Sequence, residues 1–201
     1  MWFLLGTAAE LIKVYPLIER AQREGREWFV LATGQSGKNF WMQYEDFLLP
    51  KEKALSLLDT NTDLETSTKA LQWFLRFALL SPAHVRTLCE LAFGKTPKSG
   101  DFWFVHGDTL STLVGARLGT RMKCQVVHIE AGMRSHNWKN PFPEEINRRL
   151  TARYASFHMC PDLAAAQNLK NEGYKKNVVV AGGNTVRDAL DLCTNSHRSS
   201  D

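Results

Sequence analysis

Residues 2–34 read WFLLGTAAELIKVYPLIERAQREGREWFVLATG, and their pattern predicts the fold class. The apolar run Trp2–Leu5 predicts a strand that ends at Gly6. Apolar residues then recur at helical spacing up to Gly25, which predicts an amphipathic helix. A second apolar run, Trp28–Leu31, predicts another strand. A strand, a helix and a strand within roughly thirty residues are typical of a βαβ unit, whose strands are parallel and whose crossover is right-handed.

The same alternation continues along the rest of the chain. Further strands are expected at Leu55–Leu58, Phe102–Val105, Gln125–Ile129, Phe157–Cys160 and Val178–Val180. Helices are expected at residues 65–93, Leu110–Leu118, Glu144–Phe157, Ala164–Leu169 and Val186–Leu192. We therefore expect a doubly wound α/β domain with a mainly parallel, Rossmann-like sheet. This domain is predicted to span residues 1–194, and a polar tail is predicted at residues 195–201.

Composition narrows the class of protein. The chain has 201 residues, of which 44% are hydrophobic and 23% charged, so an intrinsically disordered protein is excluded. A net charge of +4 is too weak for a nucleic-acid surface and suits small anionic ligands such as nucleotide sugars. The apolar runs are too short to span a bilayer and no signal segment is evident, so we expect a cytoplasmic protein without membrane contact. Four cysteines without a CxxC pair predict reduced thiols, and no ligand spacing indicates a metal site.

The residues that follow each strand give a candidate site. In an open parallel sheet, ligands bind outside the carboxyl ends of the strands, where the loops into the helices converge. Small or polar residues follow five of the predicted strands: Gly6, Thr7, Glu10 and Lys13; Gly34 and Gln35; His106, Gly107, Asp108 and Thr109; His128, Glu130, Gly132 and Arg134; and Gly182, Gly183, Asn184 and Thr185. Thr7 is also a suitable helix N-cap, with Glu10 at capping-box spacing.

Each of these residues also has a structural interpretation. The turn at Gly6 lacks both GxGxxG and the P-loop Lys-Ser/Thr, so it is no dinucleotide fingerprint. Taken alone, Asp108 is better explained as a helix N-cap, since Asp is a favoured cap residue. His106 and His128 lie on strands, where a hydrogen-bonded core histidine is the commoner outcome. Glu130 follows an apolar strand directly, so we expect its carboxylate either to have a cationic partner or to take part in chemistry.

The segment PFPEEINRRLT, residues 141–151, is the most informative one. Glu144 and Arg148 stand four residues apart, so both are expected to project from one face of a helix. One interpretation is a surface ion pair that contributes little. The other is a carboxylate that Arg148 keeps ionised and that faces the same crevice as Asp108 and Glu130. Three carboxylates in one crevice can divide general acid and base roles between them.

Four motifs in this order resemble those of the non-hydrolysing bacterial UDP-N-acetylglucosamine 2-epimerases. They are VHGDT at residues 105–109, HIEAGMR at residues 128–134, PEEINRRLT at residues 143–151 and GNTVRDAL at residues 183–190. Hydrolysing relatives carry a Glu-Gly-Gly turn after the shared strand and lack PEExNR, so the resemblance favours the non-hydrolysing branch. It extends over essentially the whole chain.

The resemblance implies one half of a glycosyltransferase-B-type fold, in which two Rossmann-like domains enclose a nucleotide-sugar cleft. It implies elimination of UDP from UDP-N-acetylglucosamine with loss of the C2 proton, and re-addition to give UDP-N-acetylmannosamine. No cofactor is implied, and the full-length protein is expected to be a homodimer. The motifs match catalytic positions at Asp108, Glu130, Glu144 and Arg148. The resemblance also implies substrate-binding roles for Gly6, Thr7, Lys13, Gln35, His106 and Arg134.

The chain departs from the family pattern at three points. Ala8 replaces an arginine that helps to hold the nucleotide, and Ser36 replaces a histidine in the region that binds an allosteric substrate molecule. The family's second half, with a catalytic histidine and most of the UDP contacts, is expected to be absent. Two other hypotheses therefore remain: a degenerate, non-catalytic paralogue that binds nucleotide sugars or a partner, and one half of a split glycosyltransferase.

Overall fold

The protein is built on one parallel sheet of seven strands in the order β3-β2-β1-β4-β5-β6-β7. The computed structural model describes residues 1–58, 67–135, 137, 141–183 and 185–198, with the side chains of residues 67 and 193–198 left out of the description. The strands are β1 (Trp2–Leu5), β2 (Phe29–Ala32), β3 (Ala54–Ser56), β4 (Phe102–His106), β5 (Gln125–Ile129), β6 (Phe157–Cys160) and β7 (Val178–Val180). The doubly wound, Rossmann-like prediction is thus confirmed.

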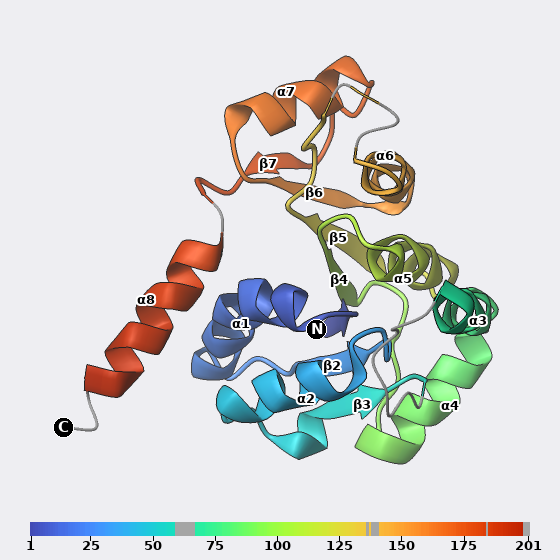
Figure 1. The fold of residues 1–201 in the computed structure, drawn as a ribbon, viewed down its shortest axis with the longest axis vertical. Helices are drawn as coiled ribbons and strands as arrows, with labels where there is room; N and C mark the ends of the chain where they lie inside the picture. Colours follow the sequence, from blue (N-terminus) through green and yellow to red (C-terminus); the bar gives the residue numbers. More distant parts are fainter. Residues whose placement is uncertain (59–66, 136, 138–140, 184, 199–201) are drawn as a thin grey trace.

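Helices cover both faces of the sheet, as Figure 1 shows. They are α1 (Ala8–Arg23), α2 (Gly37–Asp46), α3 (Ser67–Ala78), α4 (Pro82–Phe93), α5 (Leu110–Arg121), α6 (Glu144–Tyr154), α7 (Leu163–Asn171) and α8 (Thr185–Arg198), with a short 3₁₀ turn at Lys51–Lys53. Helices α1 and α2 pack on one face, and α3, α4 and α5 pack on the other. Helix α8 crosses to the side of α1.

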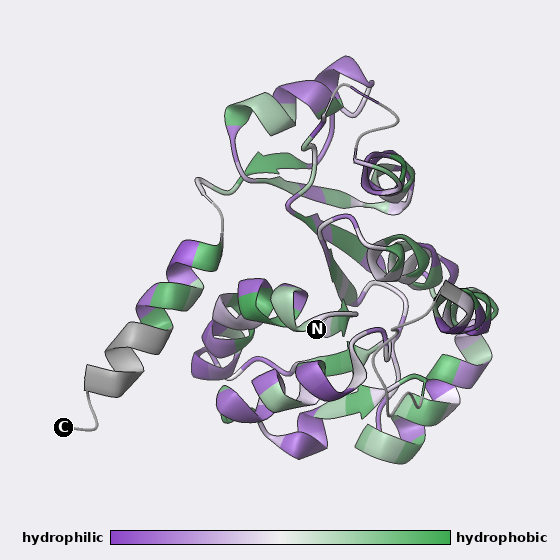
Figure 2. Cartoon of the chain, viewed as in Figure 1, coloured by the Kyte–Doolittle hydropathy of each residue, from purple (hydrophilic) through white to green (hydrophobic). Residues whose placement is uncertain are grey.

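Burial on both faces explains why the strands are continuously apolar. In β1, Phe3 and Leu5 pack with α1 and α2, whereas Trp2 and Leu4 pack with the helices of the opposite face. All four residues are buried, as expected for a strand in the middle of a parallel sheet. Figure 2 shows the same arrangement, with apolar strands in the interior and polar residues along the outer helix surfaces.

The helices differ from the prediction at three points. The single helix predicted over residues 65–93 is two helices in the described part, because the chain turns at Ser81 and Pro82. The Ser81 hydroxyl accepts the His84 amide at 3.1 Å and Pro82 occupies the first turn of α4, so both residues start a new helix. Helix α2, after the second strand, was not predicted. The helix expected at Glu144–Phe157 ends earlier, at Tyr154.

At the carboxyl end of the chain, helix α8 runs to Arg198 and so includes the first residues of the expected polar tail. The division at residue 194 stays a prediction. Cys89, Cys124 and Cys160 are free and buried, which agrees with the expected thiols. Within the described residues, no helix is both long and apolar enough to cross a bilayer.

The strand order indicates where in the fold a functional site is expected. The chain proceeds from β1 toward β3 on one side and from β4 toward β7 on the other, so the direction of winding reverses between β1 and β4. Helices that leave two neighbouring strands toward opposite faces open a crevice outside the carboxyl ends of those strands. Gly6 follows β1, and Gly107 and Asp108 follow β4, so the motif residues lie at this switch point.

Candidate active site

The turn after β1 packs closely against its neighbours. A Cβ atom at Gly6 would lie 2.1 Å from the Ser111 Oγ and 2.8 Å from the Gln35 Oε1, so only glycine fits here. The Ser111 hydroxyl donates to the Gln35 Oε1 at 2.6 Å and contacts the Thr33 hydroxyl at 2.9 Å. The structure thus brings Gly6 and Gln35 together at the switch point, as the sequence predicted.

Glu10 joins the turns after β1 and β4. Thr7 caps α1, its Oγ1 accepting the Glu10 amide at 3.2 Å, which confirms the predicted cap. The Glu10 carboxylate accepts the Gly6 amide at 2.6 Å and the Thr109 hydroxyl at 2.8 Å. The residue is 4% exposed, and burial raises the pKa of its carboxyl to about 7. The capping-box spacing was visible in the sequence, but the contact with Thr109 was not.

Glu130 has the cationic partner that its position called for. The Lys13 Nζ lies 3.0 Å and 3.3 Å from the two carboxylate oxygens. The backbone of Glu130 has a φ of 63°, a left-handed conformation that costs energy for a residue other than glycine and that is common at functional sites. The sheet edge therefore holds this carboxylate in one orientation at the end of β5.

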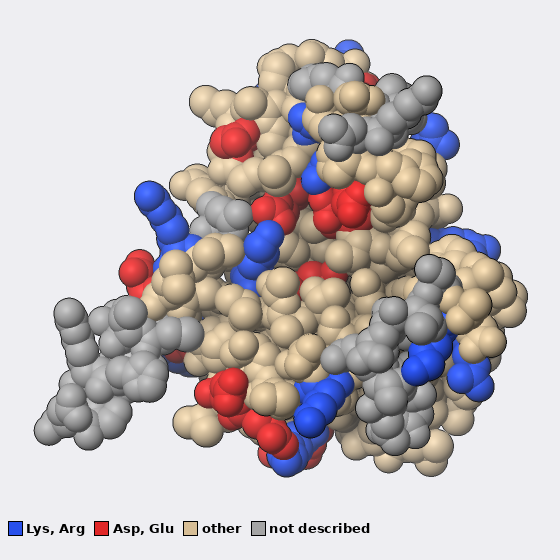
Figure 3. Space-filling view, viewed as in Figure 1, with Lys and Arg blue, Asp and Glu red and all other residues tan. Residues whose placement is uncertain are grey.

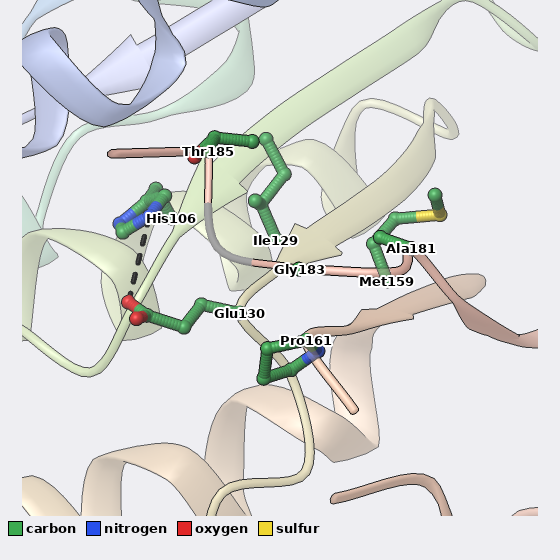
Figure 4. A pocket seen from close by; sticks show the side chains of 8 residues that line it. All are labelled: His106, Ile129, Glu130, Met159, Pro161, Ala181, Gly183 and Thr185. Carbon is green, nitrogen blue, oxygen red and sulfur yellow. Dashed lines mark ion pairs between the residues drawn. The ribbon is translucent and has the colours of Figure 1, made fainter. Parts of the chain in front are cut away.

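His106 faces Glu130 from the end of β4, with its Nε2 3.5 Å from the Glu130 Oε2 (Figure 4). Burial, and next the nearby Lys13 charge, lower the pKa of His106 to about 3, so the imidazole is neutral at physiological pH. Lys13 is then the positive charge that balances Glu130. The His106 ring forms part of the wall on the same side of the crevice and places a polar nitrogen atom there.

His128 supports the turn that carries Asp108. Its Nε2 lies 2.7 Å from the Gly107 carbonyl oxygen, and burial lowers the pKa of this histidine to about 3. A neutral imidazole donates its Nε2 proton to that carbonyl. Gly107 has a φ of 74°, so it makes the tight turn without steric cost. The core interpretation of His128 is therefore correct, and the histidine also fixes the direction in which the chain enters Asp108.

Asp108 is paired with Arg148, and it does not cap the following helix. The cap of α5 is Thr109, whose Oγ1 accepts the Thr112 amide at 3.1 Å, so the helix-cap interpretation of Asp108 was wrong. The Arg148 Nη2 donates to the Asp108 Oδ2. The Asn147 side chain donates to the Asp108 carbonyl oxygen at 2.9 Å, which ties the β4 turn to α6.

The expected pairing of Glu144 with Arg148 was also wrong. Arg148 contacts Glu145, three residues before it, with 3.4 Å between Nη1 and Oε2, and its other contact is Asp108. The Glu144 Oε2 is buried and has no hydrogen-bond partner among the residues that the structure describes. Two carboxylates stand within one helical turn of Arg148, and sequence spacing alone cannot tell which one a flexible arginine selects.

Arg134 is held by Glu172, the residue that follows α7. Its Nε and Nη2 each lie 2.8 Å from a carboxylate oxygen of Glu172, and its Nη1 donates to the Met133 carbonyl. The Arg134 side chain is 1% exposed. These contacts place the guanidinium with α7 and do not bring it to the carboxylates of the crevice. Its predicted role in substrate binding stays a prediction.

A small pocket lies beside Glu130, where the start of α8 approaches the sheet edge. It is lined by His106, Ile129, Glu130, Met159, Pro161, Ala181, Gly183 and Thr185 (Figure 4) and encloses about 20 Å³, room for a single water molecule. Acidic and basic side chains gather in the hollow at the centre of the face shown in Figure 3. In the described part of the chain, no group of three or more His, Cys, Asp or Glu is arranged to hold a metal ion.

The three motif carboxylates have different environments. Glu130 is balanced by Lys13, Asp108 is paired with Arg148, and the buried Glu144 Oε2 has no described hydrogen-bond partner. Carboxylates are among the groups that serve as general acids and bases in enzymes. The amino-terminal ends of α1 and α5 point their amides toward the same crevice and favour an anionic ligand there.

Comparison with known proteins gives a consistent result. The family model of UDP-N-acetylglucosamine 2-epimerase matches residues 21–201. The UDP-N-acetylglucosamine 2-epimerase of Salmonella borreze is 35% identical over 191 residues, which is 94% of this chain and 46% of that protein. The enzyme of the same name from Methanocaldococcus jannaschii is 31% identical, over 92% of this chain and 46% of its own length.

Solved structures agree with the sequence relatives. UDP-GlcNAc 2-epimerase from Neisseria meningitidis bound to UDP-GlcNAc superposes with a TM-score of 0.77 at 27% identity, over 98% of this chain and 50% of that one. The Methanocaldococcus jannaschii enzyme in complex with UDP-GlcNAc and UDP gives 0.72 at 29% identity, over 94% and 47%. The chain spans about half the length of the relatives it matches. By its family-model match, its relatives and its fold, the chain belongs to the UDP-N-acetylglucosamine 2-epimerase family.

Proposed function

We propose that this chain forms the amino-terminal half of a non-hydrolysing UDP-N-acetylglucosamine 2-epimerase. The observation that supports the proposal is the position of Asp108 and Glu130, which follow the neighbouring strands β4 and β5 and come from two motifs far apart in the sequence. A structural role alone gives no reason for two acidic side chains to stand beside the amino termini of α1 and α5. Glu144 is assigned to the same site by the resemblance of its motif. Relatives with this fold include structures that bind UDP-GlcNAc and UDP.

The proposed reaction needs what these residues can supply. A base removes the C2 proton of UDP-N-acetylglucosamine, the C–H electron pair forms the C1–C2 double bond, and UDP leaves with the electrons of its bond to C1. Return of UDP to C1 and of a proton to the opposite face of C2 gives UDP-N-acetylmannosamine. Carboxylates serve the proton transfers, and Lys13, Arg148 and the helix amino termini favour the departing diphosphate. The proposed chemistry requires no metal or redox cofactor.

The complete protein is proposed to have a second Rossmann-like domain that closes the cleft from the opposite side. We also propose a cytoplasmic homodimer. Helix α3 supports dimerisation, because Leu71 and Leu75 are 58% and 50% exposed and stand four residues apart along it, and Leu79, directly after the helix, is 80% exposed. Exposed apolar stripes of this kind are typical of surfaces that contact another protein.

The direct test compares residues 1–201 alone with a fused protein, in which residues 1–201 are followed by the carboxyl-terminal half of the Salmonella borreze relative. The fused protein is expected to convert UDP-N-acetylglucosamine to UDP-N-acetylmannosamine. The 201-residue chain is expected to fold and to show no conversion, since it lacks the contacts and the exclusion of water that a second half provides. Conversion by the chain alone would contradict the need for a second half.

Ala8 gives a second prediction, because it lies in the first turn of α1 where the family pattern has an arginine. Ala8→Arg in the fused protein is expected to tighten UDP binding by about 1.5–3 kcal/mol, since one charge-assisted hydrogen bond to phosphate is gained. Titration calorimetry with UDP measures the change. Ala9→Arg is the matched control, because it adds the same charge one residue further along, at an exposed position. Equal affinities for the wild type and Ala8→Arg would show that this turn does not face the diphosphate.

A further inference from the structure

Arg148 lies at one end of a row of alternating charges. Glu145 contacts Arg148 (3.4 Å) and the Nε of Arg149 (2.9 Å), and Arg149 in turn contacts Glu172 at 2.8 Å. Glu172 also binds Arg134, so the row runs from Asp108 through α6 to α7. Every link joins opposite charges, and the row connects the crevice with the outer edge of the sheet.

Glu145 is the buried centre of this row. Its side chain is fully buried, and its Oε2 also accepts the Ser135 amide at 3.1 Å, from the connection after β5. A buried carboxylate is stable only when cations and hydrogen-bond donors satisfy it, so Glu145 holds its two arginines firmly. The proposed epimerase roles of Asp108, Glu130 and Glu144 do not use Glu145.

Two carboxylates compete for Arg148 on its own helix. Glu144 stands four residues before it, a spacing that favours an ion pair, and Glu145 stands three residues before it. In the structure Arg148 contacts Glu145 and Asp108, and no ion pair joins Glu144 to the residues described. The anchoring of Glu145 by Arg149 and Ser135 thus decides which way Arg148 points.

We propose that Glu145 is a positioning residue of this active site, which holds Arg148 against Asp108 and away from Glu144. The inference rests on the proposed epimerase function. The second glutamate of the PEE motif, Glu145, then has a different role from the first, Glu144. Glu145 keeps a cation on Asp108 and keeps the same cation from neutralising Glu144, so the two carboxylates retain different environments.

The kinetic test uses Glu145→Gln in the fused protein. We expect kcat to fall about 10- to 100-fold with KM within about threefold of wild type, because a misplaced Arg148 disturbs the reacting groups more than the bound nucleotide. Glu24→Gln is the matched control: Glu24 also accepts two arginine side chains, Arg20 and Arg26, but on the exposed end of α1. This control is expected to keep wild-type kinetics.

A double-mutant cycle separates positioning from general destabilisation. If Glu145 acts through Arg148, Arg148→Gln combined with Glu145→Gln is expected to have the kcat of Arg148→Gln alone. Independent effects that multiply would overturn the inference. If Glu145→Gln does not fold, Glu172→Gln at the partly exposed part of the row replaces it. That variant is expected to lower kcat about two- to fivefold, again without a further effect on Arg148→Gln, and wild-type kinetics would overturn the inference.

NMR of the 201-residue chain tests the same inference without a measurement of turnover. The guanidinium NMR signals of Arg148 are expected to show restricted rotation in the wild type and in Glu24→Gln, and free rotation in Glu145→Gln. Unchanged restricted rotation in Glu145→Gln would contradict the proposed positioning. A fused wild-type protein without turnover would instead overturn the proposed function and leave this measurement valid.

Discussion

Asp108→Asn, Glu130→Gln and Glu144→Gln in the fused protein are each expected to lower kcat by roughly 10²–10⁴-fold, the usual range for a general acid or base. Each substitution keeps the size of the side chain and removes the group that can exchange a proton. Asp108 and Glu130 also lose the negative charge that their partners Arg148 and Lys13 balance. The measurement is the initial rate of formation of UDP-N-acetylmannosamine at saturating substrate.

Controls for this series must show that the fold survives. The far-ultraviolet circular dichroism and the unfolding midpoint of each variant are compared with wild type, and Glu90→Gln, at an exposed position of α4, serves as a charge-matched substitution far from the crevice. A folded variant with near-normal turnover would remove that carboxylate from the proposed mechanism. The largest effect is expected at whichever carboxylate takes the C2 proton.

Glu10→Gln is expected to make the chain more stable than wild type by about 3 kcal/mol at pH 8 and to leave its stability near wild type at pH 4. Burial raises the pKa of Glu10 from 4.5 to about 7 in the folded protein. Between these two values the folded state keeps a proton that the unfolded state releases, so the stability contributed by this group is present below pH 4.5 and is lost as the pH rises to 7.

Glutamine imitates the protonated form of Glu10. Its amide oxygen can accept the Gly6 amide and its amino group can donate to the Thr109 hydroxyl, the two contacts that the carboxyl makes. Urea unfolding of both proteins from pH 4 to pH 8 measures the difference. A difference that does not change with pH would show that the pKa of Glu10 is the same in the folded and unfolded states.

Most of the fold could be predicted from the sequence because burial on both faces leaves a clear pattern. Continuous apolar runs such as Trp2–Leu5 end at glycine or polar residues, and that pattern predicts strands and turns with little ambiguity. The helix boundary within residues 65–93 was harder to predict, because apolar residues at helical spacing continue across Ser81 and Pro82, which start a second helix. Helix α2 carries polar residues on much of its surface, so its sequence shows only a weak periodic pattern of apolar residues.

The candidate site was predicted where a residue's role follows from its place at the end of a strand. Glu130 was expected to need a cation or to take part in chemistry, and Lys13 is that cation. Arg148 was assigned the wrong partner because its choice depends on Asp108, which is distant in the sequence, and on the buried anchoring of Glu145. Contacts of this kind depend on tertiary packing and leave no local sequence signal.

Proton NMR of the fused protein with UDP-N-acetylglucosamine in D₂O reports directly whether the C2 proton exchanges with solvent. Removal of the C2 proton and its return from solvent predict that UDP-N-acetylmannosamine appears with deuterium at C2, and that the remaining UDP-N-acetylglucosamine gradually loses its C2 proton signal. The Glu144→Gln form is expected to slow both changes. A folded fused protein that leaves the C2 proton in place and forms no UDP-N-acetylmannosamine would contradict the claim that this crevice is half of an epimerase active site.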